Sequence, residues 1–157
     1  MPSRTEAPAE FFALTSSPRR PGRSSFFPGV IVSKQILIAD DSSTVRRILK
    51  TFLEDRGNVR VCGEAANGFE AVEKAKMLHP DLVLLDLAMP EMNGVEAASV
   101  LKKMMPNVRI IVFTMFSQNI GRSLTSAIGV DMVLSKPDGM RALVEAIDGL
   151  LSPNPAL

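Results

Sequence analysis

The amino-acid sequence predicts an α/β fold in which a doubly wound, five-stranded parallel sheet is covered by five helices. Between residues 35 and 151, short apolar runs alternate five times with amphipathic segments. This alternation is typical of βα units, whose right-handed crossovers produce a parallel sheet. The runs at 81–86 and 108–114 are nearly all apolar, as expected for strands covered on both faces. The whole segment is about half as long as a (β/α)₈ barrel requires.

The first unit begins at Gln35–Asp41, an apolar run that ends in two aspartates. The next segment is predicted to be a helix, because apolar residues recur at i, i+3, i+4, i+7 and i+8. Gly57 suits the left-handed position that ends such a helix. The residues expected on the buried face of this helix are Val45, Ile48, Leu49, Phe52 and Leu53.

Four more units follow in the same pattern. A strand is predicted at Val59–Ala65, and a helix at Gly68–Leu78 with Phe69, Val72 and Ala75 on its apolar face. His79-Pro80 ends that helix, and Pro106-Asn107 ends the next, which follows a loop at 89–94 and runs to about Met105. The remaining predicted elements are a helix marked by Ile120, Leu124 and Ile128 and ended by Gly129, a strand at Met132–Ser135, and a helix at Met140–Leu151.

Composition divides the chain into a tail at 1–33, a folded domain at 34–152 and a short C-terminal tail at 153–157. Residues 1–29 hold five prolines, five serines and two glycines, and the charges through residue 35 sum to +3. Such a segment is expected to be disordered. A docking peptide built on the Phe11-Phe12 and Phe26-Phe27 pairs, or a membrane-surface arm, remains an alternative for it.

The composition of the whole chain excludes several function classes. Its net charge is +1, which argues against a strongly basic nucleic-acid binder. It contains one cysteine and one histidine, which excludes a disulfide framework, a Cys-based zinc site and most His-metal chemistry. The apolar runs are far shorter than the ~18 residues of a membrane span.

Polar residues follow four of the predicted strands. Asp40 and Asp41 follow the first, Asp86 the third, Thr114 ends the fourth, and Lys136 follows the fifth. Ligands of open parallel sheets bind beyond the carboxyl ends of the strands, so these side chains are expected to converge.

The chemistry of this set is specific. Three clustered carboxylates repel one another and favour a cation, and hard oxygen ligands suit Mg²⁺. A carboxylate can also act as a nucleophile toward phosphorus and form an aspartyl-phosphate. Phosphoryl transfer mainly needs charge neutralisation and positioning, which Mg²⁺, the Lys136 ammonium and the Thr114 hydroxyl can supply.

These motifs resemble those of bacterial response-regulator receiver domains of the CheY-like type, in order and at the family's spacing from about Gln35 to Leu151. The resemblance implies the strand order 2-1-3-4-5. The segments VCGEAANGFEAV and VFTMFS are most similar to LuxR-type receivers, and no helix-turn-helix output domain is expected after Ser152. The segments that carry the resemblance are Ile36–Asp41, DLVLLDLAMPEMNG, VFTMFS and LSKP.

The resemblance implies a role for each site residue. Asp86 falls on the phospho-acceptor position, and Asp41 falls on the direct Mg²⁺ ligand. Asp40 falls on the ligand that usually acts through water, and Ala88 falls where a backbone carbonyl completes the metal shell. Mg²⁺ is the only cofactor that the resemblance implies.

Thr114 falls on the switch hydroxyl, and Lys136 falls on the lysine that pairs with phosphate. The Lys136–Pro137 bond resembles a peptide that is cis in the family, although most X–Pro bonds are trans. One position departs from the pattern, because Val133 stands where receivers commonly carry a switching Tyr or Phe. Phe116 is a candidate for part of that role, and packing on the fourth helix is its alternative.

The implied function is that of a stand-alone receiver that accepts a phosphoryl group on Asp86 from a histidine kinase or a phosphotransfer protein. Such a domain signals and is not an enzyme, apart from self-phosphorylation by small donors and autodephosphorylation. Its downstream partner is expected on the face formed by 118–128, 132–134 and 140–150. The resemblance implies a cytoplasmic location and no binding of nucleic acid or membrane by this chain.

Three other functions compete with this one. A flavin-binding electron carrier shares the βα pattern, but Asp40 and Asp41 would repel its phosphate. A haloacid-dehalogenase-type phosphatase needs a second acid two residues past its nucleophile, where this chain has Ala88. A receiver-fold module that works without phosphorylation is the remaining alternative, and Val133 favours it.

Overall fold

The structure is a computed structural model that describes residues 32–115 and 121–153. The chain separates into two units, 1–30 and 31–157. The predicted disordered tail at 1–33 therefore lies almost entirely outside the described residues, as do Phe116, Ile120 and most of 153–157. Among the described residues, no helix is long and apolar enough to cross a membrane.

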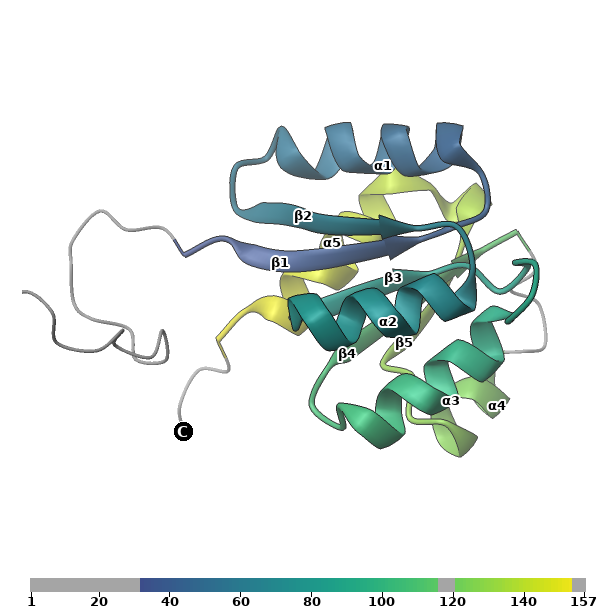
Figure 1. The fold of residues 1–157 in the computed structure, drawn as a ribbon. Coiled ribbons are helices and arrows are strands. Elements are labelled where there is room, and N and C mark those ends of the chain that lie inside the picture. Colours follow the sequence, from purple (N-terminus) through teal and green to yellow (C-terminus); the bar gives the residue numbers. More distant parts are fainter. Residues whose placement is uncertain (1–31, 116–120, 154–157) are drawn as a thin grey trace, which may run out of the picture. The chain divides into compact units, whose positions relative to one another are not determined.

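The second unit alternates strands and helices from Lys34 to Leu151 (Figure 1). Its five strands form one parallel sheet in the order β2-β1-β3-β4-β5, which confirms the predicted fold. A short 3₁₀ turn, η2, at Lys136–Asp138 follows the last strand. The elements are β1 (Lys34–Ala39), α1 (Ser43–Glu54), β2 (Val59–Ala65), α2 (Gly68–Leu78), β3 (Leu82–Leu85), α3 (Gly94–Met104), β4 (Arg109–Thr114), α4 (Gly121–Ala127), β5 (Met132–Ser135) and α5 (Gly139–Leu151).

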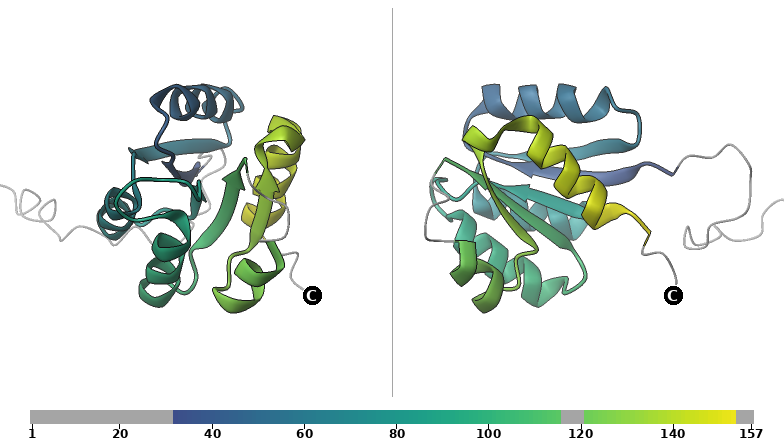
Figure 2. Two further views of the ribbon diagram at one scale, coloured as in Figure 1. Left: turned by 90° about the vertical axis from the view of Figure 1, so that its right-hand side faces the viewer. Right: turned by 180° about the vertical axis from the view of Figure 1, so that it is seen from behind.

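Helices cover both faces of this sheet, α1 and α5 on one side and α2, α3 and α4 on the other (Figure 2). Alternate residues of the central strands supply the two cores, because successive strand side chains point to opposite faces. In β4, Ile110 and Val112 pack toward α2 and α3, whereas Ile111 and Phe113 pack toward α1 and α5. Both faces of β4 are therefore buried, as its apolar sequence predicts.

The predicted apolar faces of α1 and α2 are wider than the buried ones. In α1, Leu49 and Leu53 are buried, but Ile48 is 55% exposed and Phe52 is 37% exposed. In α2, Phe69 at the first turn is 56% exposed. The prediction was wrong for these three residues, because each helix contacts the sheet along a narrower stripe than its apolar periodicity spans.

Two aspartates hold the amino-terminal ends of the strands. The Asp131 carboxylate accepts hydrogen bonds from the Ile110 backbone N–H (2.8 Å), from Lys102 Nζ (2.9 Å) and from Arg109 Nη1 (2.8 Å). The Asp81 carboxylate accepts from the Gln35 N–H at 2.8 Å. Burial raises the pKa of Asp131, but the bonds from Ile110, Lys102 and Arg109 outweigh it, and the net pKa lies below its ordinary value.

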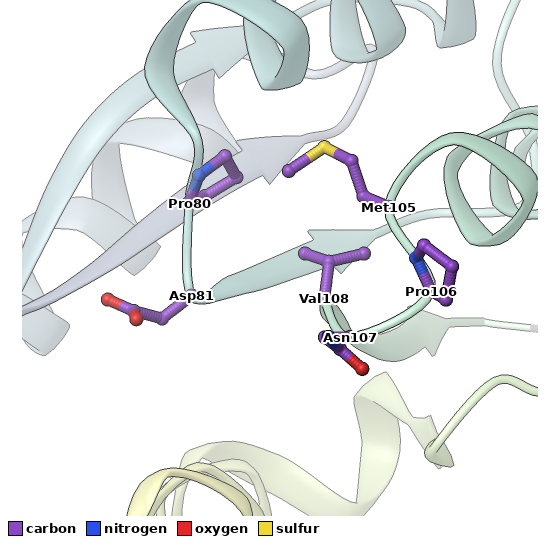
Figure 3. Close-up of a pocket in the computed structure, with 6 residues that line it drawn as sticks. All are labelled: Pro80, Asp81, Met105, Pro106, Asn107 and Val108. Carbon is purple, nitrogen blue, oxygen red and sulfur yellow. The ribbon is translucent and has the colours of Figure 1, made fainter.

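A shallow pocket of about 300 Å³ lies at this same edge, where β3 and β4 begin (Figure 3). Pro80 and Met105 face each other across it, and the Asp81 carboxylate points away from it toward its bond with β1. None of the sequence-predicted site residues lines this pocket. The predicted site residues lie instead at the opposite edge, beyond the carboxyl ends of the strands.

Candidate functional site

The three aspartates lie just beyond the carboxyl ends of β1 and β3. Both strands end one residue before an acid, at Ala39 and at Leu85. The Asp40 N–H donates to the Ala65 carbonyl (3.0 Å), and the Asp86 N–H donates to the Ala39 carbonyl (2.9 Å). The sheet hydrogen bonding thus continues to the acids and brings the two segments side by side.

Asp40, Asp41 and Asp86 form one cluster, as the sequence predicts. One oxygen from each carboxylate lies within 4.8 Å of those of the other two. Asp40 is 2% exposed and Asp86 is 6% exposed, whereas Asp41 is exposed to solvent. The cluster is therefore closed on the protein side and open to solvent at Asp41.

Lys136 supplies a positive charge to the two buried acids. Its Nζ donates to Asp40 Oδ2 at 2.6 Å and to Asp86 Oδ2 at 3.3 Å. Burial lowers the pKa of Lys136, but the hydrogen bond that its ammonium donates to Asp40 and the charges of both acids outweigh this effect, so the net pKa is raised. The Lys136–Pro137 peptide is trans, whereas the resemblance implied a cis bond, and it opens the η2 turn.

The backbone fixes the second oxygen of each buried carboxylate. Asp40 Oδ1 accepts the Ser42 N–H at 2.9 Å, and Asp86 Oδ1 accepts the Leu87 N–H at 2.8 Å. Ser42 also caps α1, since its hydroxyl accepts the Val45 N–H. Both buried acids are thus held in one orientation before any ligand arrives.

The remaining predicted residues lie around this cluster. Thr114 is fully buried at the end of β4 and stands opposite Ser135, the residue before the lysine. Ala88 is exposed in the loop after Asp86. Val133 is half-buried in β5 and packs against the core on the α2 and α3 side.

Sequence reasoning missed two residues that shape the site. Gly94 starts α3 so close to the segment that follows β3 that a Cβ there would lie 2.1 Å from the Asp86 carbonyl oxygen. Its signal was a glycine at the end of the loop predicted at 89–94. Arg46 donates from Nη1 to the Asp40 carbonyl oxygen at 2.6 Å. An arginine on an amphipathic helix carries no sequence signal for such a contact.

The donor set fits a hard divalent cation. Three carboxylates within reach of one another supply the oxygen ligands that Mg²⁺ prefers, and the exposed side leaves room for the waters that Mg²⁺ keeps. Asp41 is the open carboxylate of this set, because it has no hydrogen-bond partner among the described residues.

Comparison with known proteins gives a consistent result. Residues 36–148 match the family described as response regulator receiver domain. The chain is 39% identical over 117 residues to the chemotaxis protein CheY of Thermotoga maritima, covering 74% of this chain and 97% of that protein. It is 36% identical over 115 residues to the response regulator VraR of Staphylococcus saprophyticus, covering 72% of this chain but only 54% of VraR, about half its length.

The fold gives the same assignment. The crystal structure of a LuxR-family two-component response regulator from Aurantimonas superposes with a TM-score of 0.72 at 28% identity, covering 76% of this chain and 86% of the other. Aspartate phosphorylation and Mg²⁺ binding are general features of receiver domains, which are signalling modules of two-component systems. The acid cluster, the lysine, the strand order and the family match agree, and the chain belongs to the response regulator receiver domain family.

Proposed function

We propose that this domain accepts a phosphoryl group on Asp86 from a histidine kinase or a histidine phosphotransfer protein and signals through a changed surface. One observation carries the proposal. The buried Asp86 carboxylate lies within reach of two other acids and of the Lys136 ammonium, which is the arrangement that phosphoryl transfer to a carboxylate needs.

In the proposed reaction an Asp86 carboxylate oxygen attacks phosphorus. A new P–O bond forms while the P–N bond to the donor imidazole breaks, and the leaving imidazole keeps the electron pair and takes up a proton. The Leu87 N–H already holds Asp86 Oδ1 at 2.8 Å, so the attacking group is oriented in the resting state. Such orientation lowers the entropic part of the barrier.

Lys136 and Thr114 are the proposed partners of the transferred group. The lysine lies 3.3 Å from Asp86 Oδ2 and is the nearest described cation to the reacting carboxylate. When the phosphoryl group arrives, we expect the ammonium to keep its bond to Asp40 and to pair with a phosphoryl oxygen. Thr114, buried at the end of the neighbouring strand, supplies the hydroxyl.

Asp41 and Asp86 are the proposed direct ligands of Mg²⁺, with Asp40 acting through water and the Ala88 carbonyl completing the shell. The bound ion would neutralise charge on the phosphoryl oxygens. The resting contacts support this division, because Asp40 Oδ2 already pairs with Lys136 at 2.6 Å whereas the Asp41 carboxylate is open to solvent.

The experiment is incubation with Mg²⁺ and a small phosphodonor such as acetyl phosphate, followed by intact mass. We expect a gain of about 80 Da, one phosphoryl group, on the wild type. Asp86→Asn should show no gain. Asp55→Asn, at an exposed position outside the site, is the matched control and should be modified like the wild type. A full adduct on Asp86→Asn would overturn the assignment.

A phosphorylation-independent interaction module is the second candidate, and Val133 favours it. A half-buried valine on β5 cannot swing in the way that an aromatic ring does.

If phosphorylation succeeds, we expect a weak switch carried by Thr114 and the following loop, with a free-energy difference on the order of 1–2 kcal/mol. Residues 116–120 of that loop lie outside the described residues. Amide shift mapping with a phosphate mimic distinguishes the two, because the module predicts no change.

A further inference from the structure

Arg46 lies near the start of α1, and its guanidinium bridges the ends of two strands. Nη1 donates to the Asp40 carbonyl oxygen at 2.6 Å, and Nε donates to Glu64 Oε1 on β2 at 3.4 Å. The side chain is only 17% exposed. A short, largely buried, charge-assisted bond to a carbonyl oxygen holds that carbonyl firmly.

The carbonyl in question belongs to the peptide that joins Asp40 to Asp41. Every other polar group of Asp40 is also held: its N–H by Ala65, Oδ1 by the Ser42 N–H and Oδ2 by Lys136. Asp41 differs, because its carboxylate is exposed and has no hydrogen-bond partner among the described residues. The orientation of the Asp41 side chain therefore depends on the peptide plane that precedes it.

Arg46 is itself anchored. Glu64 lies on β2 directly opposite Ile38 of β1. Its second oxygen lies 3.7 Å from Lys50 Nζ, and its carbonyl accepts a hydrogen bond from Lys74 of α2. The guanidinium thus links the peptide between the two acids to β2 and holds it at a fixed distance from that strand.

We propose that Arg46 is a positioning residue of the cation site. By fixing the Asp40–Asp41 peptide it directs the Asp41 carboxylate toward Asp86, and it thereby sets the Mg²⁺ affinity of the domain. The inference rests on the proposed function, because it needs Asp41 to be a cation ligand. Outer-shell contacts that orient ligands typically account for about 10- to 100-fold in metal affinity.

The direction of the change in Mg²⁺ affinity when Arg46 is replaced distinguishes a positioning role from a purely electrostatic one. Arg46 is positive, so its charge repels a cation, and removing that charge alone would strengthen Mg²⁺ binding. Loss of the positioning contact has the opposite effect. The proposal therefore predicts weaker binding in a variant that carries less positive charge.

The test compares Mg²⁺ dissociation constants of the full chain at a temperature where far-UV circular dichroism shows every variant folded. The chain has no Trp or Tyr, so the titration is followed by calorimetry and by backbone amide shifts. Arg46→Met removes all donors. Arg47→Met, at an exposed neighbouring position, changes the charge equally without removing the contact to Asp40. Arg46→Lys keeps the charge but lacks the forked guanidinium. It is the test variant if Arg46→Met does not fold.

We expect about tenfold weaker Mg²⁺ binding in Arg46→Met, a smaller loss in Arg46→Lys and wild-type or slightly tighter binding in Arg47→Met. The Asp41 and Ser42 amides should broaden or shift in the Mg²⁺-free Arg46 variants. Unchanged or tighter binding in both Arg46 variants overturns the positioning role. If the wild type itself binds no Mg²⁺, the cation part of the proposed function fails, which is a distinct result.

Discussion

Replacing Lys136 by methionine removes the ammonium from the acid cluster while leaving most of the buried stem. The lysine makes a 2.6 Å bond to Asp40 and a 3.3 Å bond to Asp86, and the two carboxylate side chains are only 3% and 7% exposed. Without the lysine, two buried charges lose their nearest described counter-ion. The expected result is a marked loss of stability.

The size of that loss follows from these contacts. Breaking a buried ion pair by removing one partner costs about 3–5 kcal/mol. Lys136 is 16% exposed and the second bond is long, which places the estimate at the low end, about 3 kcal/mol. For a domain of this size that corresponds to a fall in melting temperature of about 10 °C.

The assay is thermal unfolding by circular dichroism, first with a chelator and then with saturating Mg²⁺. Bound Mg²⁺ can take over part of the neutralisation, so Mg²⁺ should raise the melting temperature more in Lys136→Met than in the wild type. Lys103→Met, at an exposed position on α3, is the control with the same charge change. A variant within 1–2 °C of the wild type in chelator, with an equal Mg²⁺ effect, would refute the reasoning, since about 3 kcal/mol is expected.

Three further predictions concern stability and access. Asp131→Asn should cost about 2 kcal/mol at pH 7, because one amide oxygen cannot replace a carboxylate that accepts from three donors. Since the pKa of Asp131 is lowered on folding, its contribution is present above the ordinary carboxyl pKa and is lost as the pH falls through the folded value. Urea unfolding should show that the stability difference between wild type and variant shrinks as the pH falls below the ordinary carboxyl pKa of about 4, and a difference that stays constant would contradict it. His79→Gly should raise stability by about 0.5–1 kcal/mol, because His79 ends α2 at φ 48° in the left-handed region; an unchanged urea midpoint speaks against that. Gly94→Ala should lower both stability, by about 1–3 kcal/mol, and the yield of phosphorylated protein, because its Cβ would overlap the Asp86 carbonyl; a wild-type phosphorylation yield would argue otherwise.

Much of the fold was accessible from apolar periodicity. The predicted bounds of β2, α2 and β5 agree with the structure, because glycine, proline and polar residues mark where each apolar run stops. Periodicity did not reveal how much of each helix the sheet covers. Ile48 and Phe52 repeat in phase with Leu49 and Leu53, yet only the latter two are buried.

That the site residues converge was predictable from the topology of the sheet. Parallel strands bring their carboxyl ends to one edge, so acids that follow β1 and β3 must meet. The pairing inside the site was not predictable, because it depends on side-chain reach. No spacing in the sequence indicates that Lys136 lies nearer to Asp40 than to Asp86, or that Arg46 binds a carbonyl.

The two edges of the sheet differ in the hydrogen bonds that their aspartates make. At the amino-terminal edge Asp81 and Asp131 each accept a backbone N–H, from Gln35 and Ile110, and each returns its own N–H to that same residue's carbonyl. At the other edge, among the described residues, the carboxylates of Asp40 and Asp86 accept backbone N–H groups only from Ser42 and Leu87, one or two residues along the chain, and they lie close to each other. Local opening should therefore start at the acidic edge, and amide hydrogen exchange should be slowest at Gln35 and Ile110. The sheet would then open first at the edge where the proposed phosphodonor has to reach Asp86, which is 6% exposed, while the rest of the domain stays folded.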